Sequence, residues 1–235
     1  MIGLVTGASR GIGKTIALEL AGLGYDLAIT GRDEASLEQT ASELKALGVR
    51  CECITADLGD DSSYEMLVEK CVAAYGGLDL LVNCAGLSHS GPFEEATPEL
   101  WDRIFAVNAK APFFISKAAL PYLKQSEKPI VINIASVVGF KGYAKQSVYA
   151  SSKHALTGFT KVFAKEVQPF GIRVHLISPG GVATEMVKQM RPDINADELI
   201  QTEEIAEIVR FLVTRKGKGT IDDFYIRRYS GLAFD

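Results

Sequence analysis

The stretch that decides the fold is Thr6-Gly7-Ala8-Ser9-Arg10-Gly11-Ile12-Gly13, which joins an apolar run at 2–6 to an amphipathic stretch at 13–23. Its three glycines permit a tight turn after a strand. They also let the backbone approach a pyrophosphate that rests on the N-terminus of the following helix. We therefore interpret the segment as a strand, a dinucleotide-binding loop and a helix.

The sequence Gly13-Lys14-Thr15 raises a second interpretation, the phosphate-binding loop of nucleoside triphosphatases. That loop needs a glycine five positions before Gly13, where this chain has Ala8. The shift by one residue removes the phosphate cradle and disfavours a triphosphatase.

Apolar runs alternate with amphipathic stretches along the rest of the chain. The pattern predicts strands at 2–6, 25–30, 50–55, 78–83, 129–135, 173–178 and 223–226. It predicts helices at 13–23, 34–47, 62–75, 98–123, 148–168 and 202–212. Continuous apolar strands between helices are typical of a doubly wound, Rossmann-type parallel α/β sheet. We expect about seven strands with helices on both faces, in a single domain, 1–235. The segment 182–197 lacks clear periodicity, and we expect it to form a lid over the substrate.

The composition narrows the class of protein. Of the 235 residues 47% are hydrophobic and 23% are charged, and the net charge is −4. With no basic block and no apolar stretch near the roughly 18 residues of a membrane span, we expect neither nucleic acid nor membrane as a partner. The first strand begins directly after Met1, which argues against a secretion signal and favours the cytoplasm. The four cysteines lack the spacing of a zinc site, so we expect reduced thiols and no metal.

Several motifs resemble those of the short-chain dehydrogenase/reductase family, and the resemblance covers nearly the whole chain. The glycine loop matches Thr-Gly-x-x-x-Gly-x-Gly. Asp57-Leu58 resembles the pair that contacts adenine, and Asn83-Cys84-Ala85-Gly86 resembles Asn-Asn-Ala-Gly with cysteine in place of the second asparagine. The segment 179–184 resembles the Pro-Gly-x-Val-x-Thr stretch that holds the nicotinamide. The resemblance implies the following cofactor-binding residues: Gly7, Ser9, Arg10, Gly11, Ile12, Gly13, Arg32, Asp57, Leu58, Asn83, Ala85, Gly86, Lys153, Pro179, Gly180, Val182 and Thr184.

The end of the second strand favours NADP(H) over NAD(H). Gly31 stands where an acidic residue would accept a hydrogen bond from the 2′-hydroxyl of the ribose. Arg32 follows it and can offer a planar fork to a 2′-phosphate, with Arg10 approaching from the other side. The alternative is that both arginines are solvated, with Asp33 neutralising Arg32.

Tyr149 and Lys153 are the candidate catalytic pair, because residues four apart share one helix face. A neighbouring ammonium would lower the pKa of the phenol toward neutrality. Ser136 follows the fifth strand and can bind the substrate oxygen. The family resemblance adds Asn108, which would maintain a water chain to Lys153, and gives Lys153 a second role in holding the ribose.

These residues predict an NADP(H)-dependent oxidoreductase that moves a hydride between nicotinamide and a carbonyl or alcohol. It resembles the carbonyl and 3-ketoacyl reductase-like members of the family, although the strand at 223–226 departs from the usual ketoreductase ending. Two alternatives are a non-catalytic nicotinamide-binding sensor and an epimerase or dehydratase with tightly bound nicotinamide. The helices at 98–123 and 148–168 carry apolar residues on more than one face, so we expect a homodimer or homotetramer through them.

Overall fold

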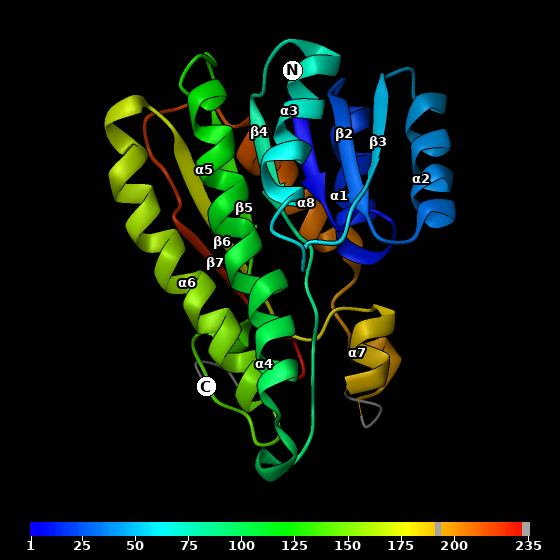
Figure 1. Cartoon of the computed structure of the whole chain (residues 1–235), viewed down its shortest axis with the longest axis vertical. Coiled ribbons are helices and arrows are strands. Elements are labelled where there is room, and N and C mark those ends of the chain that lie inside the picture. The colour runs from blue at the N-terminus through cyan, green and yellow to red at the C-terminus, as the bar shows by residue number, and fades with distance from the viewer. Residues whose placement is uncertain (191–193, 232–235) are drawn as a thin grey trace.

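The computed structural model describes residues 1–190 and 194–231, so residues 191–193 of the predicted lid lie outside the described residues. Seven parallel strands form one sheet in the order β3-β2-β1-β4-β5-β6-β7 (Figure 1). The strands are β1 (Ile2–Thr6), β2 (Asp26–Gly31), β3 (Cys51–Thr55), β4 (Leu80–Asn83), β5 (Ile130–Ile134), β6 (Arg173–Pro179) and β7 (Asp223–Ile226). The strand order reverses between β1 and β4, and sheets of this kind bind ligands beyond the carboxyl ends of the strands at that point. The predicted Rossmann-type fold is confirmed.

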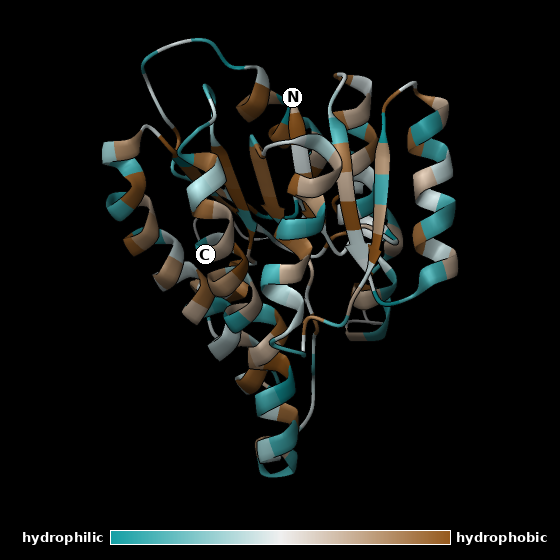
Figure 2. Ribbon diagram, turned by 45° about the horizontal axis from the view of Figure 1, so that its top comes forward, coloured by the Kyte–Doolittle hydropathy of each residue, from teal (hydrophilic) through white to brown (hydrophobic). Residues whose placement is uncertain are grey.

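Helices cover both faces of the sheet, as the sequence predicted. They are α1 (Gly11–Gly22), α2 (Glu34–Ala46), α3 (Ser63–Tyr75), α4 (Pro98–Phe105), α5 (Ala111–Leu123), α6 (Ser147–Val167), α7 (Glu185–Met190) and α8 (Thr202–Thr214). Helices α1, α2 and α8 bury one core against the sheet, and α3, α5 and α6 bury another. Neighbouring strand residues such as Leu4 and Val5 belong to different cores, because successive side chains point to opposite faces. Both faces are therefore buried at the central strands such as β4 and β5, which explains why these strands are largely apolar (Figure 2).

Local sequence signals set several helix starts. Thr97 caps α4 by accepting a hydrogen bond from the Leu100 amide at 3.2 Å, and Pro98 occupies the first turn. Asp33 caps α2 through the Ser36 amide at 2.8 Å. The boundaries of the predicted helices, except within 98–123, agree with the structure to within two residues.

Two sequence-based expectations are corrected. The predicted single helix at 98–123 is α4, a π-helical turn at Ala106–Lys110 and α5. Pro112 has no N–H to bond the carbonyl of Asn108 four residues earlier, which disfavours an uninterrupted α-helix there. No helix was predicted in the segment 182–197, whose sequence lacks clear periodicity, but the structure has α7 and a 3-10 turn at Ala196–Glu198 there.

Candidate active site and cofactor cleft

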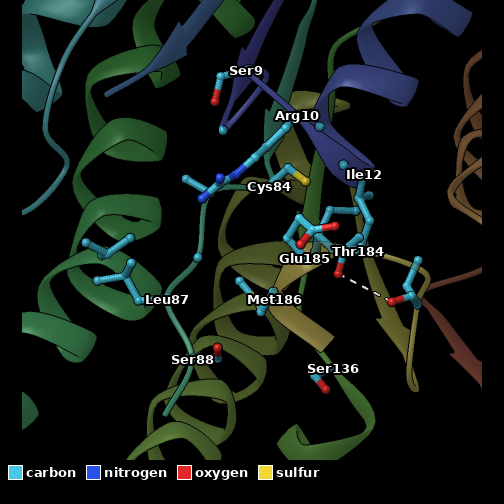
Figure 3. A pocket seen from close by; sticks show the side chains of 18 of the residues that line it. Ser9, Arg10, Ile12, Cys84, Leu87, Ser88, Ser136, Thr184, Glu185 and Met186 are labelled. Carbon is cyan, nitrogen blue, oxygen red and sulfur yellow. Dashed lines mark hydrogen bonds between the residues drawn. The ribbon is translucent and has the colours of Figure 1, made fainter. Parts of the chain in front are cut away.

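A cleft of about 590 Å³ opens beyond the carboxyl ends of the strands on both sides of the switch point. Every predicted catalytic and cofactor-binding residue lines it except Asn83 and Asn108. The residues that the prediction did not assign to the site are Thr30, Gly31, Ala56, Cys84, Leu87, Ser88, Val107, Ile134, Ala135, Ala183, Glu185, Met186, Val187 and Gln189. Figure 3 shows Arg10 of the glycine loop and Glu185 and Met186 of the lid around one space, with Ser88 and Ser136 farther along it.

The glycine loop forms one wall of this cleft and leaves no room for side chains. Gly7 has φ +69°, and a Cβ there would lie 2.7 Å from the Cα of Ala85. A Cβ on Gly13 would collide with the carbonyl oxygen of Gly7. The loop is thus a close-packed backbone turn that only glycine permits.

The first amides of α1 face the same cleft. Helix α1 begins without a side-chain cap, since Arg10 occupies the N-cap position and supplies no acceptor. Its first N–H groups, from Gly11 and Ile12, are therefore open to an anion, and the helix dipole adds favourable potential. Uncapped amides beside a glycine turn fit the pyrophosphate of a nicotinamide dinucleotide.

Charged groups surround the end of the cleft near β2 and β3. Arg10 and Arg32 are both exposed and line it, and Gly31 contributes no acid. Asp33 is not a dedicated partner of Arg32, because its carboxylate caps α2, and the hydrogen bond to Ser36 is the main cause of its lowered pKa. Asp57, which also lines the cleft, accepts two hydrogen bonds from Arg103.

Asn83 lies beneath the cleft rather than in its wall. Its side-chain amide donates to Oδ1 of Asn133 at 2.8 Å and to Oγ of Ser116 at 3.3 Å, and Asn133 in turn donates to Thr160. The side chain of Asn83 therefore ties β4 to β5 and α5, and its predicted contact with the cofactor stays a prediction. Nearby, Oγ1 of Thr6 accepts hydrogen bonds from the amides of Cys84 and Ala85 at 3.0 and 3.1 Å. These bonds fix the turn after β4.

Tyr149 and Ser136 meet at the end of the cleft beneath the lid. The phenol is only 8% exposed, and burial raises its pKa, while a hydrogen bond with the Ser136 hydroxyl opposes that shift. Ser136 itself is held at the end of β5, where its hydroxyl donates to the Pro179 carbonyl at 3.3 Å. A hydroxyl and a phenol side by side can bind the same substrate oxygen.

Lys153 is buried one helical turn beyond Tyr149, and its Nζ donates to the Ile134 carbonyl at 3.0 Å. Burial lowers the pKa of this ammonium to about 8. In this structure the Ser136 hydroxyl lowers the pKa of Tyr149, and desolvation outweighs that effect. The expected lowering of this pKa by Lys153 stays a prediction. Gly86 leaves space beside the ammonium, since a Cβ there would lie 3.6 Å from Nζ.

Asn108 lies in the π-helical turn and is fully buried. Its side chain exchanges two hydrogen bonds with the backbone of Leu87, at 2.7 and 2.8 Å, and donates to Oγ of Ser152 at 3.0 Å. Because Leu87 lines the cleft and Ser152 precedes Lys153, Asn108 joins the loop after β4 to the catalytic helix without lining the cleft itself.

The lid contributes residues beyond the predicted catalytic and cofactor-binding sets, among them Met186, Val187 and Met190, which the sequence suggested for an apolar ligand. Met190, at the end of α7, packs against a small apolar cluster of Val137, Val138, Tyr149 and Ala150. Met186, Val187 and Gln189 line the cleft from the same helix. The methionines were visible in the sequence, but their placement over Tyr149 depends on a helix that the pattern did not reveal.

Two general features concern metals and membranes. In residues 1–190 and 194–231, no group of three or more histidine, cysteine or acidic side chains is arranged to hold a metal ion. Within the same ranges, none of the helices has the length and apolarity that a membrane crossing requires. The four cysteines are free thiols.

Comparisons with known proteins agree with this architecture. The family described as short chain dehydrogenase matches residues 2–195. A 3-oxoacyl-(acyl-carrier-protein) reductase of Staphylococcus aureus (strain Mu50) is 34% identical, with 92% of this chain and 91% of the relative covered. An alcohol dehydrogenase of the archaeon Thermococcus sibiricus, in complex with 5-hydroxy-NADP, has a TM-score of 0.90 at 29% identity over 99% of this chain and 98% of that one. A metagenomic short-chain oxidoreductase in complex with NADP has a TM-score of 0.85 at 30% identity, with 98% of each chain covered.

The fold and the cleft define an oxidoreductase that depends on a nicotinamide dinucleotide, NAD or NADP. The chain belongs to the short-chain dehydrogenase/reductase family.

Proposed function

We propose that the protein is an NADP(H)-dependent carbonyl reductase or alcohol dehydrogenase. The observation that carries the proposal is the convergence of Ser136, Tyr149 and Lys153 in the same cleft as the glycine loop. The names of the similar proteins, an alcohol dehydrogenase and a 3-oxoacyl reductase, support the same class of reaction.

When bound, the nicotinamide supplies or accepts the hydride. Gly11 and Ile12 would offer backbone amides to the pyrophosphate, and Asp57 and Leu58 would contact the adenine. Pro179, Gly180, Val182 and Thr184 would hold the carboxamide, and Lys153 would bind the ribose hydroxyls. Each of these residues lines the cleft, and the glycine contacts described above fit a dinucleotide backbone.

Tyr149 moves the proton of the reaction. In the direction of reduction it donates the phenolic proton to the substrate oxygen while Ser136 donates a hydrogen bond to the same oxygen. The raised pKa of Tyr149 keeps the phenol protonated at neutral pH, which suits it to act as the acid. Asn108 supports this arrangement by fixing the loop at Leu87 and the helix at Ser152.

NADP(H) is the proposed cofactor because the β2 end of the cleft offers Arg10 and Arg32 and has glycine at position 31. A 2′-phosphate would pair with one or both guanidinium groups and would meet no opposing acid at Gly31. The NADP-type ligands named for two similar structures support the same choice.

The lid is proposed to exclude water from the reaction and to shape the substrate site. Met186 and Val187 line the cleft beside the polar Glu185 and Gln189, and Met190 packs near Tyr149, so the lid brings apolar side chains to the wall near the catalytic tyrosine. We propose substrates with an apolar substituent next to the carbonyl.

We also propose that the chain forms at least a homodimer through α4, α5 and α6. A groove on this face is lined by four phenylalanines, Phe105, Phe113, Phe114 and Phe159. Phe113 is 45% exposed and Val162, on α6, is 57% exposed. A second copy of the chain would cover this apolar surface.

The experiment that tests the function is a panel of ketones and secondary alcohols, assayed at 340 nm with NADPH and NADH in parallel. Turnover of at least one ketone with NADPH, faster than with NADH, supports the proposal. Cofactor binding without turnover of any member would favour the non-catalytic alternative. Cofactor that stays bound through gel filtration would favour the epimerase or dehydratase.

A further inference from the structure

Arg103 on α4 makes a two-pronged contact with Asp57 at the edge of the cofactor cleft. Its Nη2 donates to both carboxylate oxygens of Asp57, each at 2.8 Å. Asp57 lines the cofactor cleft, whereas Arg103 lines the apolar groove on the α4 side and comes from 46 residues later in the chain. The ion pair thus links the cofactor site to a helix that contributes no residue to the lining of that site.

The turn after β3 is built to hold this contact. The Gly59 amide donates to Oδ1 of Asp57 at 2.8 Å. A Cβ on Gly59 would collide with Nη1 of Arg103 and would lie 2.8 Å from its Cζ, so the guanidinium rests directly against the glycine backbone. The Asp57 carboxylate is therefore oriented by donors on two sides.

Arg32 lies close to the same carboxylate. Strands β2 and β3 pair Gly31 with Thr55, and the Ala56 amide donates to the Gly31 carbonyl at 3.1 Å. This register brings Arg32 and Asp57, which follow these residues, to neighbouring strand ends, and both line the cleft. Arg103 is the main cause of the lowered pKa of Asp57, and Arg32 contributes a smaller electrostatic effect in the same direction.

We propose that Arg103 is a positioning residue that sets the preference for a 2′-phosphorylated cofactor through Asp57. By occupying both oxygens of the Asp57 carboxylate, Arg103 prevents that carboxylate from pairing with Arg32. The Arg32 guanidinium is then left to the 2′-phosphate. Without Arg103, the Asp57 carboxylate competes with the 2′-phosphate for Arg32. The carboxylate also repels the phosphate, because both groups are negatively charged. The inference rests on the NADP(H) preference proposed above.

The chain provides a matched control in the neighbouring pair Asp61–Lys110. This ion pair also joins the segment after β3 to the region between α4 and α5. Neither residue lines the cofactor cleft, although both line the groove. Removal of Lys110 therefore breaks an equivalent surface link without freeing a carboxylate beside Arg32.

The test measures binding of adenosine fragments, which requires no turnover. Isothermal titration calorimetry with adenosine 2′,5′-bisphosphate and with AMP would compare the wild type, Arg103→Gln, Arg103→Lys and Lys110→Gln. An exposed charged pair contributes up to about 1 kcal/mol, which corresponds to a factor of about five in Kd. We expect Arg103→Gln to weaken the bisphosphate about five-fold and AMP clearly less, Arg103→Lys to have a smaller effect, and Lys110→Gln to change neither.

A double variant separates specificity from structure. Asp57→Asn combined with Arg103→Gln removes the competing charge, so we expect the ratio of the two Kd values to return toward the wild-type ratio. Equal weakening of both ligands by Arg103→Gln, or an unchanged ratio, would overturn the inference while leaving the proposed function intact. A wild type that binds AMP as tightly as the bisphosphate would instead overturn the proposed NADP(H) preference and the inference with it.

Discussion

Nζ of Lys153 donates a 3.0 Å hydrogen bond to the carbonyl of Ile134, the last residue of β5. The ammonium is thereby held near the same strand end that positions Ser136, two residues further on. Burial lowers the pKa of Lys153 to about 8, and burial raises the pKa of Tyr149. The two groups of the catalytic helix can therefore be told apart by pH, because the Lys153 ammonium loses its proton at a lower pH than the Tyr149 phenol does.

The first prediction concerns the pH dependence of ketone reduction. Below pH 8 both the Lys153 ammonium and the Tyr149 phenol are protonated, so kcat/KM is expected to be flat. As the pH rises through about 8, Lys153 loses its proton, and kcat/KM should fall with a slope near −1 on a logarithmic plot. Arg stays charged over this range, so any residual activity of Lys153→Arg should show no such break. A wild-type profile that is flat from pH 7 to 9 would contradict the assignment.

The second prediction concerns the proton donor. Tyr149→Phe removes the phenolic hydroxyl but keeps the ring in its buried position, so the fold and cofactor binding should persist. General acid catalysis contributes on the order of 10² to 10⁴ in rate, and we expect kcat to fall by about that factor. NADPH fluorescence titration serves as the control and should give an unchanged Kd. Full turnover in this variant would remove Tyr149 from the mechanism.

How far the sequence predicted this site depends on how local the determining interactions are. The positive φ of Gly7 and the lack of room at Gly13 arise within the loop itself, and the capped start of α4 arises from Thr97 and Pro98. The parallel type of the sheet follows from continuous apolar runs that alternate with helices. Such features could be predicted because residues near in sequence decide them.

The remaining features depend on contacts between distant segments. The pKa values of Tyr149 and Lys153 are governed by burial, which a spacing of four residues does not reveal. The pairing of Asp57 with Arg103 requires the position of α4 relative to the turn after β3. Asn83 was expected to line the cofactor site, yet its partner Asn133 lies 50 residues away on β5. In each case the prediction would have required knowledge of tertiary contacts between residues that are far apart in the sequence.

The third prediction concerns cofactor preference at the end of β2. Gly31→Asp places a carboxylate where it can accept from a free 2′-hydroxyl and repel a 2′-phosphate. We expect KM for NADPH to rise by about ten-fold, on the basis of about 1.4 kcal/mol of lost interaction, and KM for NADH to fall. A Cβ at position 31 would lie 3.1 Å from Cβ and Oγ of Ser9, so the variant should be combined with Ser9→Gly to relieve this contact. Preference for NADPH that persists in the double variant would contradict the role assigned to position 31.

The fourth prediction concerns the lid. Met190→Ala removes the apolar side chain that packs against Val137, Val138 and Tyr149. Because the apolar cluster that Met190 packs against contains Tyr149 and no residue of the glycine loop or β2, KM for an apolar ketone should rise several-fold while KM for NADPH stays unchanged. Lys188→Ala, on the same helix and paired with Glu185 on the surface, is the matched control and should alter neither value. An equal rise in both KM values would indicate general damage to the lid rather than a substrate contact.

The fifth prediction concerns the apolar face formed by α4, α5 and α6. Phe113 and Val162 are exposed there, and glutamate at either position would place an unpaired charge at the centre of a dimer interface. We expect Phe113→Glu and Val162→Glu to shift the chain to a monomer at micromolar concentration, measured by light scattering. Phe211→Glu is the matched control, because Phe211 is 43% exposed on α8, which covers the opposite face of the sheet. We expect this variant to keep the oligomeric state of the wild type. A dimer that survives both substitutions, or a wild type that is already a monomer, would exclude this face as the contact between copies.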